Sequence, residues 1–70
     1  MNYMTAIANK IAAAANLSIH TGKPVALSGI DFEAARDAIA IFPGVACADV
    51  GATLRAAGTL RGKQFRIVFR

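Results

Sequence analysis

The chain of 70 residues contains no tryptophan, one tyrosine, one cysteine, one histidine and only four acidic side chains. The single Cys47 cannot form an intramolecular disulfide, and no set of cysteines suggests a zinc site. The apolar run at residues 11–15 is far shorter than the ~20 residues that span a bilayer, and residues 1–5 lack the basic start of a signal peptide. We therefore expect no metal, no cofactor and no membrane association, and a reducing, cytoplasmic location.

The length predicts one small domain over residues 1–70. A chain of this size buries only about 60% of the surface that its unfolded form exposes, so its stability is marginal. Hydrophobic residues make up 56% of the sequence, but 16 of them are alanines, which leaves few large side chains for a core. Such a core is often completed by a second copy. A homodimer therefore stays open, for instance through close packing of an alanine-rich helix.

The first predicted helix covers residues 3–16. Its apolar residues recur at three- and four-residue spacing, and the alanine run at 12–15 extends the helix because alanine is the best helix former. Asn2 or Thr5 would cap its start, and Asn16 would end it. The apolar stripe consists of Met4, Ile7, Ile11 and Ala14 or Ala15.

The second predicted helix covers residues 31–42, with its N-cap included. Asp31 is a good N-cap, and Pro43 disfavours the helical conformation in the residue before it. Between the helices, the glycine and proline at residues 20–24 predict a loop, and residues 25–27 predict a short edge strand. The apolar stripe of the second helix consists of Phe32, Ala35, Ile39 and Phe42.

The last part of the chain has the two-residue period of β-strands. Residues 53–60 and 65–70 both alternate, with a turn predicted at 61–64 and a third strand at 45–50. The inward positions are Leu54, Ala56, Gly58 and Leu60 on one arm, and Phe65, Ile67 and Phe69 on the other. A short helix over 49–57 is the alternative for the first arm. Strands are favoured because the final arm needs a pairing partner.

These elements predict an α+β fold, with two helices packed on one face of a small antiparallel sheet. The sheet would be a C-terminal β-hairpin or a three-stranded meander. Phe42 and Phe65 are expected to matter most, since truncating a buried phenylalanine to alanine costs about 3–5 kcal/mol.

The residues that carry catalysis in other proteins are sparse. His20 is predicted to be a solvated loop residue, and Cys47, which alternates with small apolar residues, a buried structural thiol. The acidic residues of 31–37 belong to a helix start and its exposed side, where carboxylates stabilise the helix dipole. The glycines next to Lys23 and Lys63 lack the remaining residues of a phosphate-binding loop. We expect no catalytic residues, no metal ligands and no enzyme activity.

The distribution of charge is the strongest functional signal. Every carboxylate lies before residue 50, whereas five of the eight basic residues lie after it. An unpaired basic segment attracts polyanions or acidic proteins. The candidate binding residues are Arg55, Arg61, Lys63, Arg66 and Arg70. If the last two strands pair, Arg55, Arg66 and Arg70 would share one sheet face, with Arg61 and Lys63 at the turn.

Two kinds of partner fit this segment. An acidic protein surface is favoured, because arginine and charge complementarity are typical of protein interfaces. The alternative is DNA or RNA bound through phosphates, for which five contacts give a salt slope of about −4 to −5. Tyr3 is the one aromatic expected to be exposed, so stacking on bases has little support. The helix over 31–42 offers a second surface, formed by Glu33, Arg36, Asp37 and Ala40, which would suit a basic partner.

In size and general character the chain resembles small phage-encoded inhibitors of bacterial machinery, anti-CRISPR proteins among them. That resemblance implies an accessory or inhibitory role and carries no individual residues. Charge reversal at Arg61 and Arg66 is expected to abolish binding and to leave the fold intact.

Overall fold

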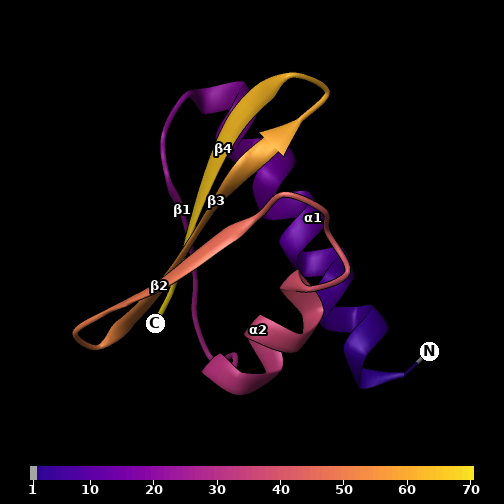
Figure 1. Cartoon of the computed structure of the whole chain (residues 1–70), viewed down its shortest axis with the longest axis vertical. Coiled ribbons are helices and arrows are strands. Elements are labelled where there is room, and N and C mark those ends of the chain that lie inside the picture. The colour runs from indigo at the N-terminus through magenta and orange to yellow at the C-terminus, as the bar shows by residue number, and fades with distance from the viewer. Residues whose placement is uncertain (1) are drawn as a thin grey trace.

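The computed structural model describes residues 2–70. In chain order the elements are α1 (Tyr3–Thr21), β1 (Val25–Leu27), α2 (Phe32–Ile39), β2 (Ala46–Val50), β3 (Thr53–Leu60) and β4 (Lys63–Phe69). The strands form one open sheet in the order β1-β4-β3-β2, and both helices lie on one side of it (Figure 1). The predicted α+β class and the three-stranded meander, β2-β3-β4, are confirmed. A fourth strand, β1, pairs in parallel with β4 and makes the sheet mixed.

Helix α1 is longer than predicted. Asn2 caps its start by accepting a 2.7 Å hydrogen bond from the Thr5 N–H. The helix passes through Asn16 and ends only at Gly22, whose left-handed backbone (φ 73°) lets its N–H bond to the Ser18 carbonyl oxygen at 2.8 Å. Glycine adopts this conformation without steric cost, which explains why the helix stops there. His20 therefore lies in the last helical turn and not in a loop.

Helix α2 is shorter than predicted. Asp31 caps it as expected, and its carboxylate accepts a 3.1 Å hydrogen bond from the Ala34 N–H. The regular helix ends at Ile39, and tight turns carry the chain on to Phe42, whose N–H bonds to the Ile39 carbonyl oxygen at 2.8 Å. Phe42 is consequently only half-buried and not a central core residue.

Two-residue turns join the meander and fix its register. Gly51 and Ala52 connect β2 to β3, and Arg61 and Gly62 connect β3 to β4. The predicted turn over 61–64 was too long, because Lys63 already pairs with Leu60 as the first residue of β4. The helical alternative over 49–57 is wrong, since residues 53–57 pair with β2 on one side and residues 54–57 pair with β4 on the other.

The core lies between the helices and one face of the sheet. Leu54, Ile67 and Phe69 are fully buried, and Phe65 is nearly so. The helices contribute Ile7, Ile11, Ala14, Ala15, Ala35, Ala38 and Ile39. Ser18 is buried among them, and its hydroxyl oxygen accepts a 2.9 Å hydrogen bond from the Arg66 N–H. This bond ties α1 to β4 at a point where β4 has no strand neighbour on that side.

Candidate functional site: an open arginine face

One face of the sheet is left uncovered. Within the ladder, Arg55 lies opposite Val68 and Arg66 lies opposite Ala57. Cross-strand partners share a face, and this face points away from α1 and α2 (Figure 1). The prediction that Arg55 and Arg66 share one face is confirmed. Arg70 directly follows β4 and has the same strand parity as Arg66 and Val68. We call the uncovered surface around these three residues the open arginine face.

The other two candidate residues lie elsewhere. Lys63 has the same strand parity as Phe65 and Ile67, so it belongs to the helix side of the sheet. Arg61 stands in the β3–β4 turn, as predicted, and its guanidinium donates a 2.8 Å hydrogen bond to the side-chain oxygen of Asn16 on α1. The five candidates therefore divide into the open arginine face and a separate pair at the hairpin tip.

Small and β-branched residues separate the arginines. A shallow cavity of about 170 Å³ lies between Arg55 and Arg66, with Pro24, Ala57 and Val68 in its lining. A second cavity of about 290 Å³ adjoins it and shares Ala57 and Arg66. Among residues 2–70, no carboxylate has the strand position that would place it on this face. The surface is thus a carboxylate-free stretch of sheet in which small and β-branched residues separate the arginine positions.

The three arginines are held differently. The Arg66 guanidinium donates a 3.1 Å hydrogen bond to the Gly22 carbonyl oxygen, which fixes its direction. The side chains of Arg55 and Arg70 make no hydrogen bond or ion pair within the described part of the chain. Charge reversal at Arg61 and Arg66 would therefore break bonds to α1 and its cap as well as alter the surface. Arg55 and Arg70 are the positions at which charge alone can be changed.

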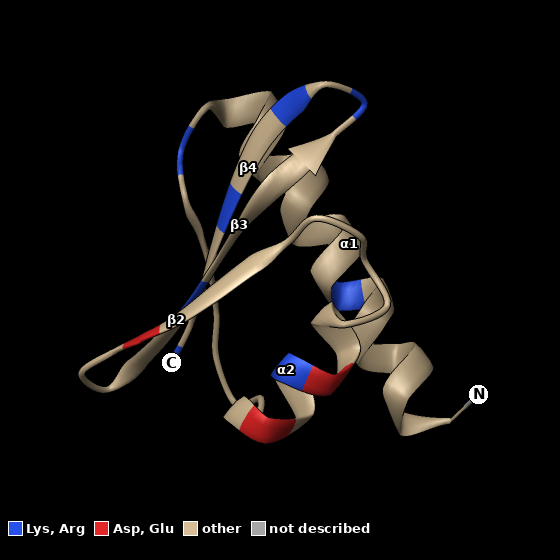
Figure 2. Cartoon of the chain, in the orientation of Figure 1, with Lys and Arg blue, Asp and Glu red and all other residues tan. Residues whose placement is uncertain are grey.

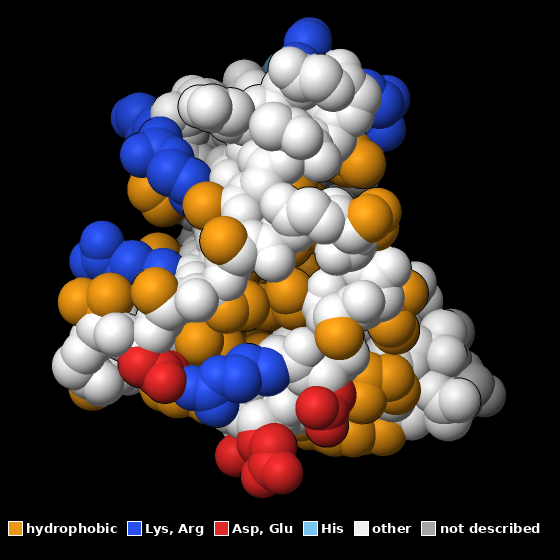
Figure 3. All heavy atoms as spheres, in the orientation of Figure 1, with side chains coloured by type: hydrophobic (Ala, Val, Ile, Leu, Met, Phe, Trp, Pro, Cys, Tyr) orange, Lys and Arg blue, Asp and Glu red, His pale blue; other side chains and the backbone are white. Residues whose placement is uncertain are grey.

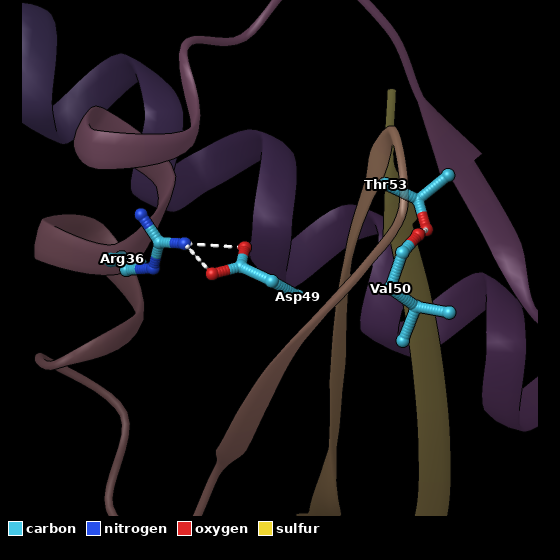
Figure 4. Close-up of polar contacts among 4 residues, drawn as sticks. All are labelled: Arg36, Asp49, Val50 and Thr53. Atoms are coloured by element: carbon cyan, nitrogen blue, oxygen red, sulfur yellow. Dashed lines mark hydrogen bonds and ion pairs between the residues drawn. The ribbon is translucent and has the colours of Figure 1, made fainter.

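The acidic residues gather on α2 and on the nearby part of β2, as Figures 2 and 3 show. Basic residues follow the strands and the upper turns, and others lie on α1 and α2. Arg36 forms an ion pair with Asp49 of β2 (Figure 4), instead of balancing Glu33 and Asp37 on its own helix. The two side chains are 44% and 60% exposed, so the pair contributes at most ~1 kcal/mol.

Cys47 is exposed, and the prediction of a buried thiol is wrong. It lies opposite Ala56 on β2, an edge strand that extends beyond the helical layer. Partial burial raises the pKa of the thiol; the Arg36 charge lowers the pKa and the Asp49 charge raises it. Residues 2–70 contain no cluster of side chains that could hold a metal ion.

An apolar cavity on the helix side was not predicted from the sequence. It has a volume of about 320 Å³ and lies between α1, the connection after α2 and the β3–β4 tip. Its lining comes from three distant segments, which is why no local pattern predicts it. Apolar side chains dominate, and Asn16, Thr59 and Arg61 are the polar residues among the lining residues Ile11, Ala12, Ala15, Asn16, Phe42, Pro43, Val45, Thr59, Leu60, Arg61 and Phe65.

Comparison with protein-family models, curated proteins and solved structures finds no match for this chain. No helix within residues 2–70 has the length and apolar character needed to cross a membrane.

Proposed function

We propose that this protein is a non-enzymatic interaction protein that binds an acidic protein surface through the open arginine face. Arg55, Arg66 and Arg70 supply the positive charge, and Ala57 and Val68 supply apolar contact between them. The single observation that carries this proposal is an uncovered sheet face that holds Arg55 and Arg66, continues to Arg70, and pairs none of the three with an acidic side chain.

The composition of the face supports a protein partner over nucleic acid. Protein interfaces combine an apolar centre with arginine, which is enriched there. Small residues at Ala57 and Val68 allow the partner's backbone or a short acidic side chain to approach the sheet closely. Residue Tyr3, the exposed aromatic, lies on α1 and away from this face, at 65% exposure, so base stacking has no platform on it.

Phosphate binding is the alternative use of the same face. Arginine forks suit phosphate oxygens as well as carboxylates. With Arg55, Arg66 and Arg70 as the contacts, the salt slope on duplex DNA would be about −2.7. The hairpin-tip pair, Arg61 and Lys63, would have to reach the same strand from the other side of the sheet to restore the steeper slope expected for five contacts.

An inhibitory role, of the kind found among small phage-encoded proteins, is the most specific form of the proposal. A small positively charged face can occupy the acidic patch by which a larger protein recognises another macromolecule. No catalytic group is required for this action, because occupancy alone blocks the surface.

A binding titration separates the two partner classes. Labelled duplex DNA, single-stranded DNA and RNA are each titrated with the protein at about 50 and 200 mM salt, between which three phosphate contacts weaken binding about fortyfold. We expect no saturable binding of any of the three at the lower salt concentration. Tight binding with this salt dependence, lost in the Arg55→Glu/Arg70→Glu variant, would overturn the protein-partner proposal and establish the alternative.

A further inference from the structure

The two edges of the sheet differ in their protection against strand addition. β1 has only three residues and follows Lys23 and Pro24, and short strands, lysine and proline all discourage pairing. β2 has five residues, and all of them are exposed. It contains neither lysine nor proline, and its one carboxylate, Asp49, is neutralised by Arg36. The β2 edge therefore lacks the features that normally block another strand.

The register shows which backbone groups are free along β2. The two-residue turn makes Val50 and Thr53 the closing pair of the hairpin, which exchanges hydrogen bonds. Bonded and unbonded pairs alternate along an antiparallel ladder, so Ala48 and Ala46 also bond to β3. The N–H and C=O groups of Cys47 and Asp49 consequently point outward. These are two complete donor–acceptor sets, spaced two residues apart.

We propose that β2 pairs antiparallel with β2 of a second copy of this chain, about a twofold axis at Ala48. Cys47 of each copy then lies opposite Asp49 of the other. Both outward sets are satisfied, which gives four backbone hydrogen bonds across the interface. The two copies of Ala48 face each other at the centre as an unbonded pair.

Three features favour a second copy as the occupant. The outward groups of Cys47 and Asp49 are complementary to themselves under twofold symmetry, as an isologous interface requires. The side chains at the join are small, and Val50, 47% exposed in the single chain, would cover Ala46 of the other copy. The Arg36–Asp49 pair leaves this edge nearly neutral, so the excess positive charge of the chain lies away from the contact.

This dimer would join two four-stranded sheets into one. Arg55 lies directly opposite Ala48 in the ladder, so it would be separated from its twin by three strand spacings, ~14 Å. The two open arginine faces would then form one continuous surface. The proposed dimer is inferred from the geometry of the β2 edge alone and does not depend on the proposed function.

Sedimentation equilibrium of the wild-type protein and a Cys47→Pro variant tests the pairing. We expect the wild-type mass to rise with concentration from 7.3 kDa towards twice that value. Proline at Cys47 removes an outward N–H and leaves the β2–β3 bonds in place, so the variant should fold, as judged by circular dichroism, and dimerise about tenfold or more weakly. A wild-type protein that stays monomeric at millimolar concentration, or a variant that dimerises as well as the wild type, would overturn the proposal.

Disulfide formation tests the register. In a Cys47→Ser background, Ala48→Cys places one thiol on each side of the axis, at the Cα separation that a disulfide spans. The oxidant is oxidised glutathione. The two protein thiols form one disulfide, and the two electrons and two protons that they lose convert one oxidised glutathione into two reduced glutathiones. The control is Ala13→Cys on the exposed side of α1. We expect rapid cross-linking only for Ala48→Cys; faster cross-linking of the control, or of wild-type Cys47, would contradict this register.

Discussion

The guanidinium of Arg66 donates a 3.1 Å hydrogen bond to the carbonyl oxygen of Gly22, the residue that caps the C-terminus of α1. The backbone N–H of Arg66 bonds to Ser18, one turn earlier on the same helix. Arg66 therefore belongs to the open arginine face and also links β4 to the end of α1 through hydrogen bonds. A substitution at Arg66 would keep the backbone bond to Ser18 but remove the guanidinium bond to Gly22. It would therefore alter the binding surface and the anchoring of α1 together.

Ser18→Ala should lower the free energy of unfolding by about 1–3 kcal/mol, because it leaves the Arg66 N–H without a partner in a buried setting. Ser28, which is exposed, provides the control: Ser28→Ala should change stability by less than about 0.5 kcal/mol. Urea unfolding followed by circular dichroism measures both. Equal effects at the two positions would mean that the Ser18 hydroxyl is replaced by solvent.

Phe69→Ala should be more destabilising than Phe42→Ala. Phe69 is fully buried, so its truncation costs about 3–5 kcal/mol, which approaches the whole stability of a small domain. Phe42 is half-buried and should cost roughly half as much. If Phe69→Ala does not fold, Phe69→Leu is compared with Phe42→Leu, and Phe69→Leu should be the more destabilising of these two, at ~1 kcal/mol. A larger loss for Phe42→Ala in chemical denaturation would place the core closer to the connection after α2.

Arg61→Asn should stabilise the protein. Arg61 has a φ of 52° in a two-residue hairpin turn, where asparagine followed by glycine is the preferred pair. Relief of this backbone conformation should raise the free energy of unfolding by ~1 kcal/mol, despite the loss of the exposed bond to Asn16. Gly62→Ala should have the opposite sign, because the φ of 77° there suits only glycine. Thermal melting of both variants decides the matter, and a destabilised Arg61→Asn would show that the Asn16 contact outweighs the strain.

Cys47 should react slowly for an exposed thiol. Partial burial and the Asp49 charge raise its pKa, against the lowering effect of Arg36. The thiolate is the reactive form, so a raised pKa means a smaller reactive fraction at any pH below it. The rate of alkylation by iodoacetamide should begin to rise at a higher pH in the native protein than in the urea-unfolded protein. Asp49→Asn should speed the native reaction; no change would exclude the Asp49 charge as a cause.

The strand alternation predicted much of the fold and of the site. The period of two predicts directly that Phe65 points inward and Arg66 points outward. The same alternation in residues 53–60 predicts that Arg55 lies on the outward face with Arg66. The prediction placed Lys63 in the turn. The residue types at 61–64 do not distinguish a two-residue turn from a four-residue turn, and the length of the turn decides on which face of the sheet the Lys63 side chain lies.

Other misplacements arose where tertiary contacts decide the outcome. Cys47 has small apolar neighbours, as a core strand has, but its strand lies at an edge beyond the helices. Ser18 looks like a polar surface position on α1, since its partner Arg66 is 48 residues away in sequence. The parallel pairing of β1 likewise depends on a neighbour, β4, that no local pattern around residues 25–27 reveals.

The central claim, that the open arginine face binds an acidic protein, is tested most directly by comparing two double charge reversals. Arg55→Glu/Arg70→Glu alters that face at positions without bonds to the described chain. Lys10→Glu/Lys63→Glu makes the same change of net charge on α1 and on the helix side of β4. Each protein is immobilised, exposed to nuclease-treated bacterial lysate, and its bound proteins are quantified by mass spectrometry, with melting curves as the check on folding.

We expect one or more acidic proteins to be captured by the wild type and by Lys10→Glu/Lys63→Glu, and to fall about tenfold or more with Arg55→Glu/Arg70→Glu. Equal losses in the two variants would mean that net charge, and not this face, attracts the partner. Undiminished capture by a folded Arg55→Glu/Arg70→Glu protein would contradict the claim outright.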